Sequence, residues 1–277
     1  MRTLVHLSDL HFGRVDTSLI GPLTSHIAQL APDVLVVSGD LTQRARSKEF
    51  VAARAFLDTL PSPQIIVPGN HDIPLHNLFD RFLRPLAKYA RYIADDLEPM
   101  YVDDMVAVVG INTARSLTVK DGRINQAQMN RVRERLGRLP RALVKVIVTH
   151  HPFDLPETYA HDELVGRAPA ALAAFAACGA DLLLAGHLHA SHAGTTATRY
   201  PIDGFAALAV QAGTATSTRG RGEQNSFNVI RIDTSQITIE RHAWQPASAN
   251  FALASTERFE RSGARWMPHP SDPVPLP

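Results

Sequence analysis

Five short groups of aspartate, histidine and asparagine recur along the first two thirds of the chain. They are Asp9-Leu10-His11, Gly39-Asp40, Gly69-Asn70-His71-Asp72, His150-His151-Pro152 and Gly186-His187-Leu188-His189. Carboxylates and imidazoles bind divalent ions of manganese, iron, cobalt or zinc, and an asparagine adds a neutral carbonyl oxygen. A single carboxylate, best supplied by Asp40, can bridge two ions about 3.5–4 Å apart. The residue types therefore predict a centre of two metal ions.

Each group directly follows a short apolar run that is typical of a buried strand, and these runs cover residues 4–7, 34–37, 64–67, 143–149 and 181–185. Open α/β sheets bind ligands at the carboxyl ends of their strands, so the five groups are expected at one edge. Alternate residues of an extended chain point the same way, which would let both members of Asp9/His11 and of His187/His189 face the metals. Gly39, Gly69 and Gly186 allow the backbone to turn tightly beneath the cluster.

The elements between these strands predict an α/β fold. Helical spacing, charge patterning or alanine enrichment predicts helices over 19–30, 47–60, 126–138 and 168–178. Residues 105–111 form a further expected strand, and after residue 190 the helical periodicity gives way to the expected strands 206–210, 227–232 and 236–241. We expect one domain over residues 1–266. The last eleven residues, 267–277, contain five prolines and predict an irregular tail.

Residues 76–98 form an irregular helical segment that contains Pro85. The segment carries the aromatic residues Phe79, Phe82, Tyr89 and Tyr92. Such a segment could cap a site or form the face of a homodimer, and packing in the core explains its aromatics equally well.

The five groups together resemble the signature of the calcineurin-like metallophosphoesterases, and in detail the small bacterial class III phosphodiesterases of cyclic nucleotides or glycerophosphodiesters. The resemblance covers residues 9–189. It implies a four-layer αββα sandwich, in which helices flank two mixed β-sheets. It also implies the ligands of the two metals: Asp9, His11, Asp40 and His189 for the first, and Asp40, Asn70, His150 and His187 for the second.

By the same resemblance, His71 is a catalytic residue that is not a ligand, and it would protonate the leaving alkoxide or donate to the phosphoryl oxygens. Asp72 is expected to orient the imidazole of His71. A hydroxide that bridges the metals would attack phosphorus in line. Manganese or iron is the expected metal, with zinc or cobalt as alternatives, because the donor set accepts several ions.

Several other polar residues have both a functional and a structural interpretation. His151 adjoins the favoured ligand His150 and could instead be an outer contact or a packing residue. Three more residues, each as well explained by an ordinary loop or surface role, could contact substrate: His161, His192 and Arg115. Arg219 and Arg221, in a glycine-rich loop, could bind an anionic group or remain in solvent.

Composition limits the alternatives. The 277 residues carry a net charge of +1, which argues against a nucleic-acid polymer as partner, and the single cysteine excludes both an intrachain disulfide and a thiolate cluster. No apolar run is long enough for a membrane span, and no signal-like segment opens the sequence, so the cytoplasm is expected.

We therefore expect hydrolysis of a small-molecule phosphodiester. The alternatives are a phosphomonoesterase, a lipid-precursor pyrophosphatase, a nuclease or a non-catalytic scaffold of the same fold. The related lipid-pathway hydrolases usually carry arginine where His71 stands, and a scaffold would be expected to lack ligands that are all present here.

Overall fold

Two mixed β-sheets form the centre of the molecule in a computed structural model that describes residues 1–118, 120–155, 164–219 and 222–269. The first sheet has seven strands in the order β13-β12-β11-β10-β1-β2-β3, in which β1, β2 and β3 are parallel and the other neighbours are antiparallel. Its strands are β1 (Arg2–Leu7), β2 (Val34–Val37), β3 (Gln64–Ile66), β10 (Ser226–Ile232), β11 (Gln236–Gln245), β12 (Asn250–Ser262) and β13 (Arg265–Pro268).

The second sheet has six strands in the order β4-β5-β6-β7-β9-β8. Its four central strands are parallel, and the edge strands β4 and β8 are antiparallel to their neighbours. The strands are β4 (Met100–Val102), β5 (Val106–Gly110), β6 (Val144–Val148), β7 (Leu182–Ala185), β8 (His192–Thr195) and β9 (Leu208–Gln211).

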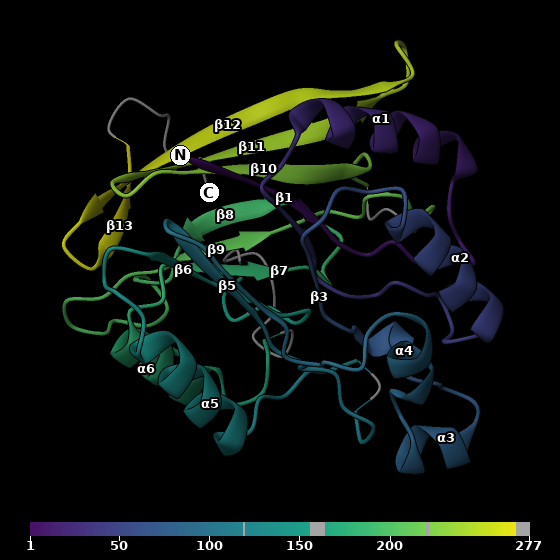
Figure 1. Cartoon of the computed structure of the whole chain (residues 1–277), viewed down its shortest axis with the longest axis horizontal. Helices are drawn as coiled ribbons and strands as arrows, with labels where there is room; N and C mark the ends of the chain where they lie inside the picture. Colours follow the sequence, from purple (N-terminus) through teal and green to yellow (C-terminus); the bar gives the residue numbers. More distant parts are fainter. Residues whose placement is uncertain (119, 156–163, 220–221, 270–277) are drawn as a thin grey trace.

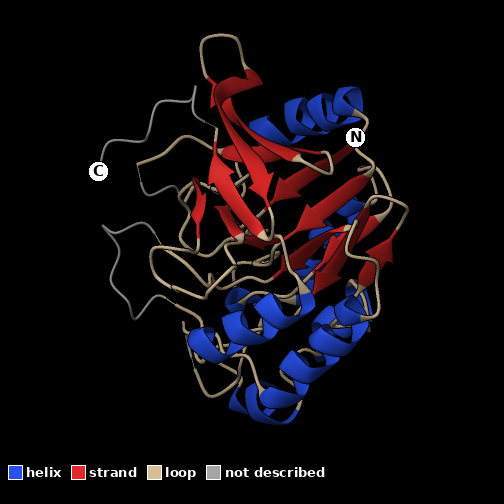
Figure 2. Cartoon of the chain, turned by 90° about the vertical axis from the view of Figure 1, so that its left-hand side faces the viewer, coloured by secondary structure: helices blue, strands red, loops and turns tan. Residues whose placement is uncertain are grey.

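Helices cover the outer face of each sheet, as Figures 1 and 2 show. One apolar core lies between the seven-stranded sheet and the helices on its side, a second lies between the two sheets, and a third lies beneath the helices of the six-stranded sheet. The first group of helices is α1 (Ile20–Leu30), α2 (Ser47–Leu57) and α4 (Ala87–Tyr92), and the second is α5 (Gln126–Gly137) and α6 (Ala168–Cys178). These layers confirm the expected αββα sandwich. Among the described residues, no helix is both long and apolar enough to cross a membrane.

The strand pattern also corrects parts of the expectation. Strands β4, β8, β12 and β13 were not expected, and β13 includes Met267 and Pro268, so irregular structure does not begin at residue 267. Residues 270–277 lie outside the described residues. The segment 76–98 forms two short helices, α3 (Leu78–Leu83) and α4, separated by Arg84, Pro85 and Leu86.

Asp181 links the two sheets at the amino end of β7, opposite to the strand ends that carry the five polar groups. One oxygen of its carboxylate accepts hydrogen bonds from Arg261 Nη2 at 2.6 Å and from Trp266 Nε1 at 3.0 Å, and the other accepts one from the amide of Lys145 at 2.9 Å. Arg261 and Trp266 belong to β12 and β13, whereas Lys145 belongs to β6. The late strands are therefore held against the six-stranded sheet by one buried carboxylate.

We expect Asp181→Ala to lower the free energy of unfolding by about 2–3 kcal/mol, because it leaves three buried or half-buried donors without their acceptor. Urea unfolding would measure the change. Asp203→Ala is the matched control: Asp203 is fully exposed, lies 3.7 Å from Arg265, and should leave stability essentially unchanged. An equal loss in both variants would contradict the role given to Asp181.

Candidate metal centre

Three side chains from both sheets form the first half of the centre. Asp9 and His11 follow β1, and His189 follows β7. His189 Nε2 lies 3.2 Å from Asp9 Oδ1 and 3.1 Å from His11 Nε2, and His11 Nε2 lies 3.5 Å from Asp9 Oδ1. Three potential ligand atoms, all buried, therefore converge on one point.

Asp40, at the end of β2, joins this group to a second one. Its Oδ2 lies 3.7 Å from His11 Nε2, and its Oδ1 lies 3.4 Å from His150 Nε2. His150 Nε2 is in turn 3.1 Å from Asn70 Oδ1 and 3.3 Å from His187 Nδ1. The two oxygens of one carboxylate thus face two separate clusters, which is the arrangement that a bridging ligand requires.

These residues fit a pair of metal ions. Neighbouring ligand atoms that are each about 2.1 Å from one ion lie roughly 3.0–3.4 Å apart, depending on the coordination geometry. The separations within the two clusters are 3.1–3.7 Å. Asp9 Oδ1 is also buried without a hydrogen-bond partner, which is rare for a carboxylate oxygen unless a cation belongs beside it. The ligand atoms of Asp9, His11 and His189 lie within 4.8 Å of one another, as do those of Asp9, Asp40 and His150; His71 and His151 are equally close to members of the two clusters.

The backbone at the ligands is left-handed rather than extended, so the expected reason for the pairing was wrong. Positive φ angles between 49° and 73° occur at five of the seven predicted ligands: Asp9, His11, Asp40, His187 and His189. Aspartate and histidine adopt this region more readily than most residues, although at some energetic cost. Each pair turns back on itself after its strand, and this turn brings both side chains to the candidate centre.

Outer contacts fix which atom of three predicted ligands, Asp9, His150 and His189, faces the centre. Asp9 Oδ2 accepts hydrogen bonds from Ser8 Oγ at 2.7 Å and from the amide of His187 at 3.0 Å, which leaves Oδ1 for a metal. The carbonyl of Ser38 lies 2.8 Å from His150 Nδ1, and the carbonyl of Arg219 lies 3.1 Å from His189 Nδ1. Both contacts turn Nε2 toward the clusters, as carbonyl partners do for histidine ligands elsewhere.

Burial and neighbouring charges shift the pKa values of several groups in the centre, in some cases in opposite directions. Burial lowers the pKa of His150, but Asp40 and Asp9 outweigh it and raise that pKa to about 9. Burial and the neighbouring His150 lower the pKa of His187 to about 3. For Asp40, burial raises the pKa, and the surrounding histidines reverse this and hold it below its usual value. The buried carboxylates of Asp9 and Asp40 are therefore stabilised by cationic groups beside them.

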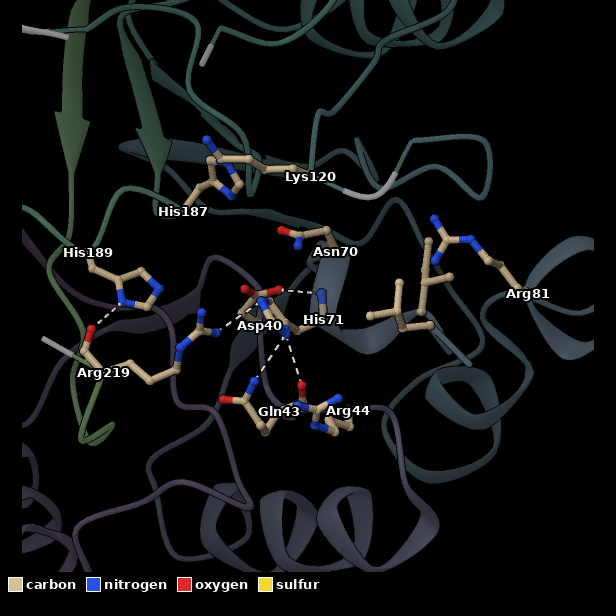
Figure 3. A pocket seen from close by; sticks show the side chains of 12 residues that line it. Asp40, Gln43, Arg44, Asn70, His71, Arg81, Lys120, His187, His189 and Arg219 are labelled. Atoms are coloured by element: carbon tan, nitrogen blue, oxygen red, sulfur yellow. Dashed lines mark hydrogen bonds between the residues drawn. The ribbon is translucent and has the colours of Figure 1, made fainter. Parts of the chain in front are cut away.

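A pocket of about 310 Å³ opens over the centre. Asp40, Asn70, His71, His187 and His189 line it, and so do four cationic side chains, Arg44, Arg81, Lys120 and Arg219 (Figure 3). Of these cations, only Arg219 had been considered from the sequence. No motif marks Arg44, Arg81 or Lys120, because each reaches the pocket from a loop or helix whose position depends on the tertiary fold.

His71 lies in this pocket and does not take part in either cluster of ligand atoms described above. Its Nδ1 is 2.8 Å from the carbonyl of Gln43, and its Nε2 is 3.0 Å from Arg219 Nη1. Its backbone amide donates to Asp40 Oδ1 at 2.9 Å. Figure 3 shows Gln43 and Arg219 approaching the ring from different sides.

Asp72 does not orient the imidazole of His71, contrary to the expectation. Its carboxylate accepts hydrogen bonds from the backbone amides of Leu41 at 3.2 Å, Thr42 at 2.9 Å and Gly69 at 2.9 Å, and from Thr42 Oγ1 at 2.9 Å. It therefore holds the turn Asn70–Asp72 against the loop after β2. The orienting contact to His71 Nδ1 comes from the carbonyl of Gln43.

The structure separates the remaining candidates. His151 is buried beside His150, but both of its ring nitrogens have other partners: Thr113 Oγ1 at 2.8 Å and the Lys120 carbonyl at 2.9 Å. His192 and Arg115 line other pockets. His161 and Arg221 lie outside the described residues.

Residues 2–191 match the family model described as calcineurin-like phosphoesterase. The chain belongs to this family. The matched range contains every predicted ligand named above, and the model covers more than half of the chain.

Two curated relatives are phosphodiesterases by their names. The chain is 32% identical over 124 residues to the glycerophosphodiester phosphodiesterase GpdQ of Enterobacter lignolyticus, over 38% of this chain and 44% of the relative. It is 23% identical over 159 residues to a probable cyclic nucleotide phosphodiesterase of Synechococcus, over 54% of this chain and 58% of the relative. The matches thus span less than two thirds of each relative.

Solved structures confirm the fold. A purple acid phosphatase from yellow lupin superimposes with a TM-score of 0.72 at 12% identity, over 93% of this chain and 53% of that chain. A dimetal phosphatase from Danio rerio superimposes with a TM-score of 0.64 at 12% identity, over 91% of this chain and 98% of that chain.

Gly69 offers a test of the centre that replaces none of the predicted ligand residues. A Cβ atom on Gly69 would lie 2.1 Å from Asp40 Oδ1 and 2.4 Å from the Asp40 amide, so Gly69→Ala must displace the carboxylate that is predicted to bridge the metals. We expect the affinity for Mn²⁺ to fall by about 10–100-fold, as it does when outer contacts of ligands are lost. Calorimetric titration would measure it. Gly137→Ala, with nothing within 4 Å of its added carbon, is the control; unchanged affinity in Gly69→Ala would count against Asp40 as a ligand.

Proposed function

We propose that this chain is a phosphodiesterase that uses two metal ions to hydrolyse a small-molecule phosphodiester. The observation that carries the proposal is the position of Asp40, whose two oxygens face two clusters of nitrogen and oxygen donors. Manganese or iron is the proposed pair, with zinc or cobalt as alternatives, since the donors are carboxylate, imidazole and amide. Location in the cytoplasm and assembly into a homodimer stay predictions from the sequence.

Two ions at these ligands would lower the pKa of a water molecule that attacks phosphorus and would neutralise charge on the phosphoryl oxygens. Proton transfer to the leaving group would be carried out by a residue of the chain, His71. The carbonyl of Gln43 can only accept, so His71 Nδ1 carries a proton and Nε2 faces the pocket. Protonated at Nε2 as well, the ring can transfer that proton to a leaving alkoxide and return to its neutral form.

Arg219 prepares the same pocket for an anion. A guanidinium can only donate, so its 3.0 Å contact to His71 Nε2 uses the neutral ring as acceptor. A phosphate that enters the pocket would compete for Arg219 and free Nε2. Substrate binding would thereby place a cation on the phosphoryl oxygens and make the imidazole available for proton transfer.

Three observations favour a small diester over other substrates. The pocket of about 310 Å³ suits a small molecule. The net charge of +1 does not favour a nucleic-acid polymer. The two curated relatives are named for glycerophosphodiesters and cyclic nucleotides.

A phosphomonoesterase or a pyrophosphatase is the second candidate. The cations that line the pocket, among them Arg44 and Lys120, would suit the additional negative charge of a monoester or a pyrophosphate.

Turnover of chromogenic esters decides between these candidates. Protein stripped of metal and reloaded with Mn²⁺ is expected to hydrolyse bis(p-nitrophenyl) phosphate faster than p-nitrophenyl phosphate. Asp40→Ala should lower the diester rate by about 10²–10³-fold or more, because it removes a ligand from both ions. A preference for the monoester would instead support the second candidate, and undiminished turnover in Asp40→Ala would refute a two-metal site.

The role of His71 predicts a dependence on the leaving group. The p-nitrophenolate ion leaves without a proton, whereas the alkoxide from glycerophosphocholine needs one. His71→Ala should therefore reduce kcat by about 10²-fold or more for glycerophosphocholine and much less for bis(p-nitrophenyl) phosphate. His192→Ala, which alters a half-buried histidine outside this pocket, is the control. Equal losses for both esters would assign His71 to the phosphoryl oxygens instead.

A further inference from the structure

Arg81 is a buried cation in the wall of the metal-centre pocket. It belongs to α3, is only 5% exposed, and lines the pocket (Figure 3). Among the described residues, no carboxylate forms an ion pair with it within 4.0 Å. Buried cations in proteins are almost always paired with an anion, since burial without one is costly. An anion for Arg81 would therefore have to enter from the pocket.

Two backbone carbonyls fix the position of this guanidinium. Arg81 Nη2 donates to the carbonyl of Thr118 at 2.7 Å, and Nη1 donates to the carbonyl of Pro74 at 3.3 Å. These contacts use only part of the N–H donors that a guanidinium carries, and a neutral carbonyl does not compensate its charge. Arg81 is thus held in place without losing its capacity to bind an anion.

Arg44 reaches the same end of the pocket from the loop after β2. Its Nη1 lies 2.9 Å from His76 Nε2, which must be the acceptor because a guanidinium can only donate. The contacts of Arg44 and Arg81 are thus to His76 and Pro74, which belong to one short segment, 74–76. Leu75, in the middle of that segment, lines the pocket as both arginines do. The two guanidiniums therefore flank the same three residues.

These cations lie to one side of the position expected for the reacting phosphate. Figure 3 shows Asp40 and His71 between Arg219 on one side and Arg81 on the other. The single negative charge of a phosphodiester would be bound at the metal centre, beside Arg219. Among the described residues that line the pocket, Asp40 is the only one with a carboxylate. Neither the protein nor a simple diester thus supplies an anion at the end that holds Arg81.

We propose that Arg44 and Arg81 form a second anion site, which binds a carboxylate or phosphate group carried by one of the two alcohols of the phosphodiester. The inference rests on the proposed function and narrows its substrate class to diesters with a second oxyanion. The scissile phosphate would lie at the metal centre, and the second oxyanion would lie at the segment 74–76. The planar fork of a guanidinium suits either oxyanion, because it can donate two parallel N–H bonds to it.

The test measures the binding of phosphonates that differ only in a terminal anion. Propyl-, pentyl- and heptylphosphonate are compared with 3-phosphonopropanoate, 5-phosphonopentanoate and 7-phosphonoheptanoate, and with bisphosphonates of the same lengths, by calorimetric titration of the Mn²⁺-loaded protein. At one length or more, the second anion should tighten binding about tenfold. A gain in only one series would identify that anion as the carboxylate or the phosphate. Equal affinities at every length would overturn the proposal.

Variants assign the gain to the two arginines. In Arg81→Gln and in Arg44→Gln the gain should fall toward one. Arg46→Gln is the matched control: its arginine is 61% exposed, lies near Arg44 in sequence and does not line the pocket, so the gain should stay at its wild-type value. Arg44 is exposed, so Arg44→Gln keeps the test open even if Arg81→Gln does not fold. A gain that persists in every folded variant would point to the metal ions as the partner of the second anion and overturn the proposal.

Turnover tests the same site on a substrate. The p-nitrophenyl diester of the best-binding ω-carboxyalkyl chain is compared with the alkyl diester of the same length. In both reactions water forms the new bond to phosphorus and p-nitrophenolate leaves, so the pair differs only in the terminal carboxylate. We expect kcat/KM to be about tenfold higher for the carboxylate, and Arg81→Gln to remove the difference. If neither ester is hydrolysed, the proposed function fails while the titrations still decide on the anion site. Equal kcat/KM values for two hydrolysed esters would overturn the inference.

Discussion

The arrangement of the candidate metal centre depends on two carboxylates that are shielded from water. The carboxylates of Asp9 and Asp40 are almost completely buried, and such burial is tolerated only where positive groups and hydrogen-bond donors surround them. Imidazoles surround them, and backbone amides of His187 and His71 donate to their oxygens. The left-handed turns after the strands, the glycines beneath them and the carbonyls that aim the histidine rings all keep donors directed at these two carboxylates.

The sandwich supplies the rigidity that this arrangement needs. Parallel strands β1, β2 and β3 end at one edge of the first sheet, and β6 and β7 end at the matching edge of the second. A dry core of valine, leucine and isoleucine between the sheets fixes their spacing. At the far end, Asp181 joins the late strands to β6 and β7. Predicted ligands attached to different sheets can therefore stay within a few ångströms of one another.

Much of this could be predicted from the sequence, because buried strands and the polar residues that follow them leave strong local patterns. The convergence of Asp9, Asp40 and His150 could be predicted in this way. The role of Asp72 could not be predicted, since its partners lie some thirty residues away on the loop after β2. Strand β12 was missed because its residues are largely exposed and lack a continuous apolar run. The place of Arg81 in the pocket likewise depends on a tertiary contact, that with the carbonyl of Thr118.

Because the predicted ligands are divided between the two sheets, a bound metal ion would connect the sheets. Each cluster draws donors from both layers: His189 joins Asp9 and His11, and His150 and His187 join Asn70. An ion in either position would cross-link the two sheets at their shared edge, as a disulfide cross-links distant segments of a chain. Binding of the metal ions would therefore slow the unfolding of the whole sandwich, rather than order one loop.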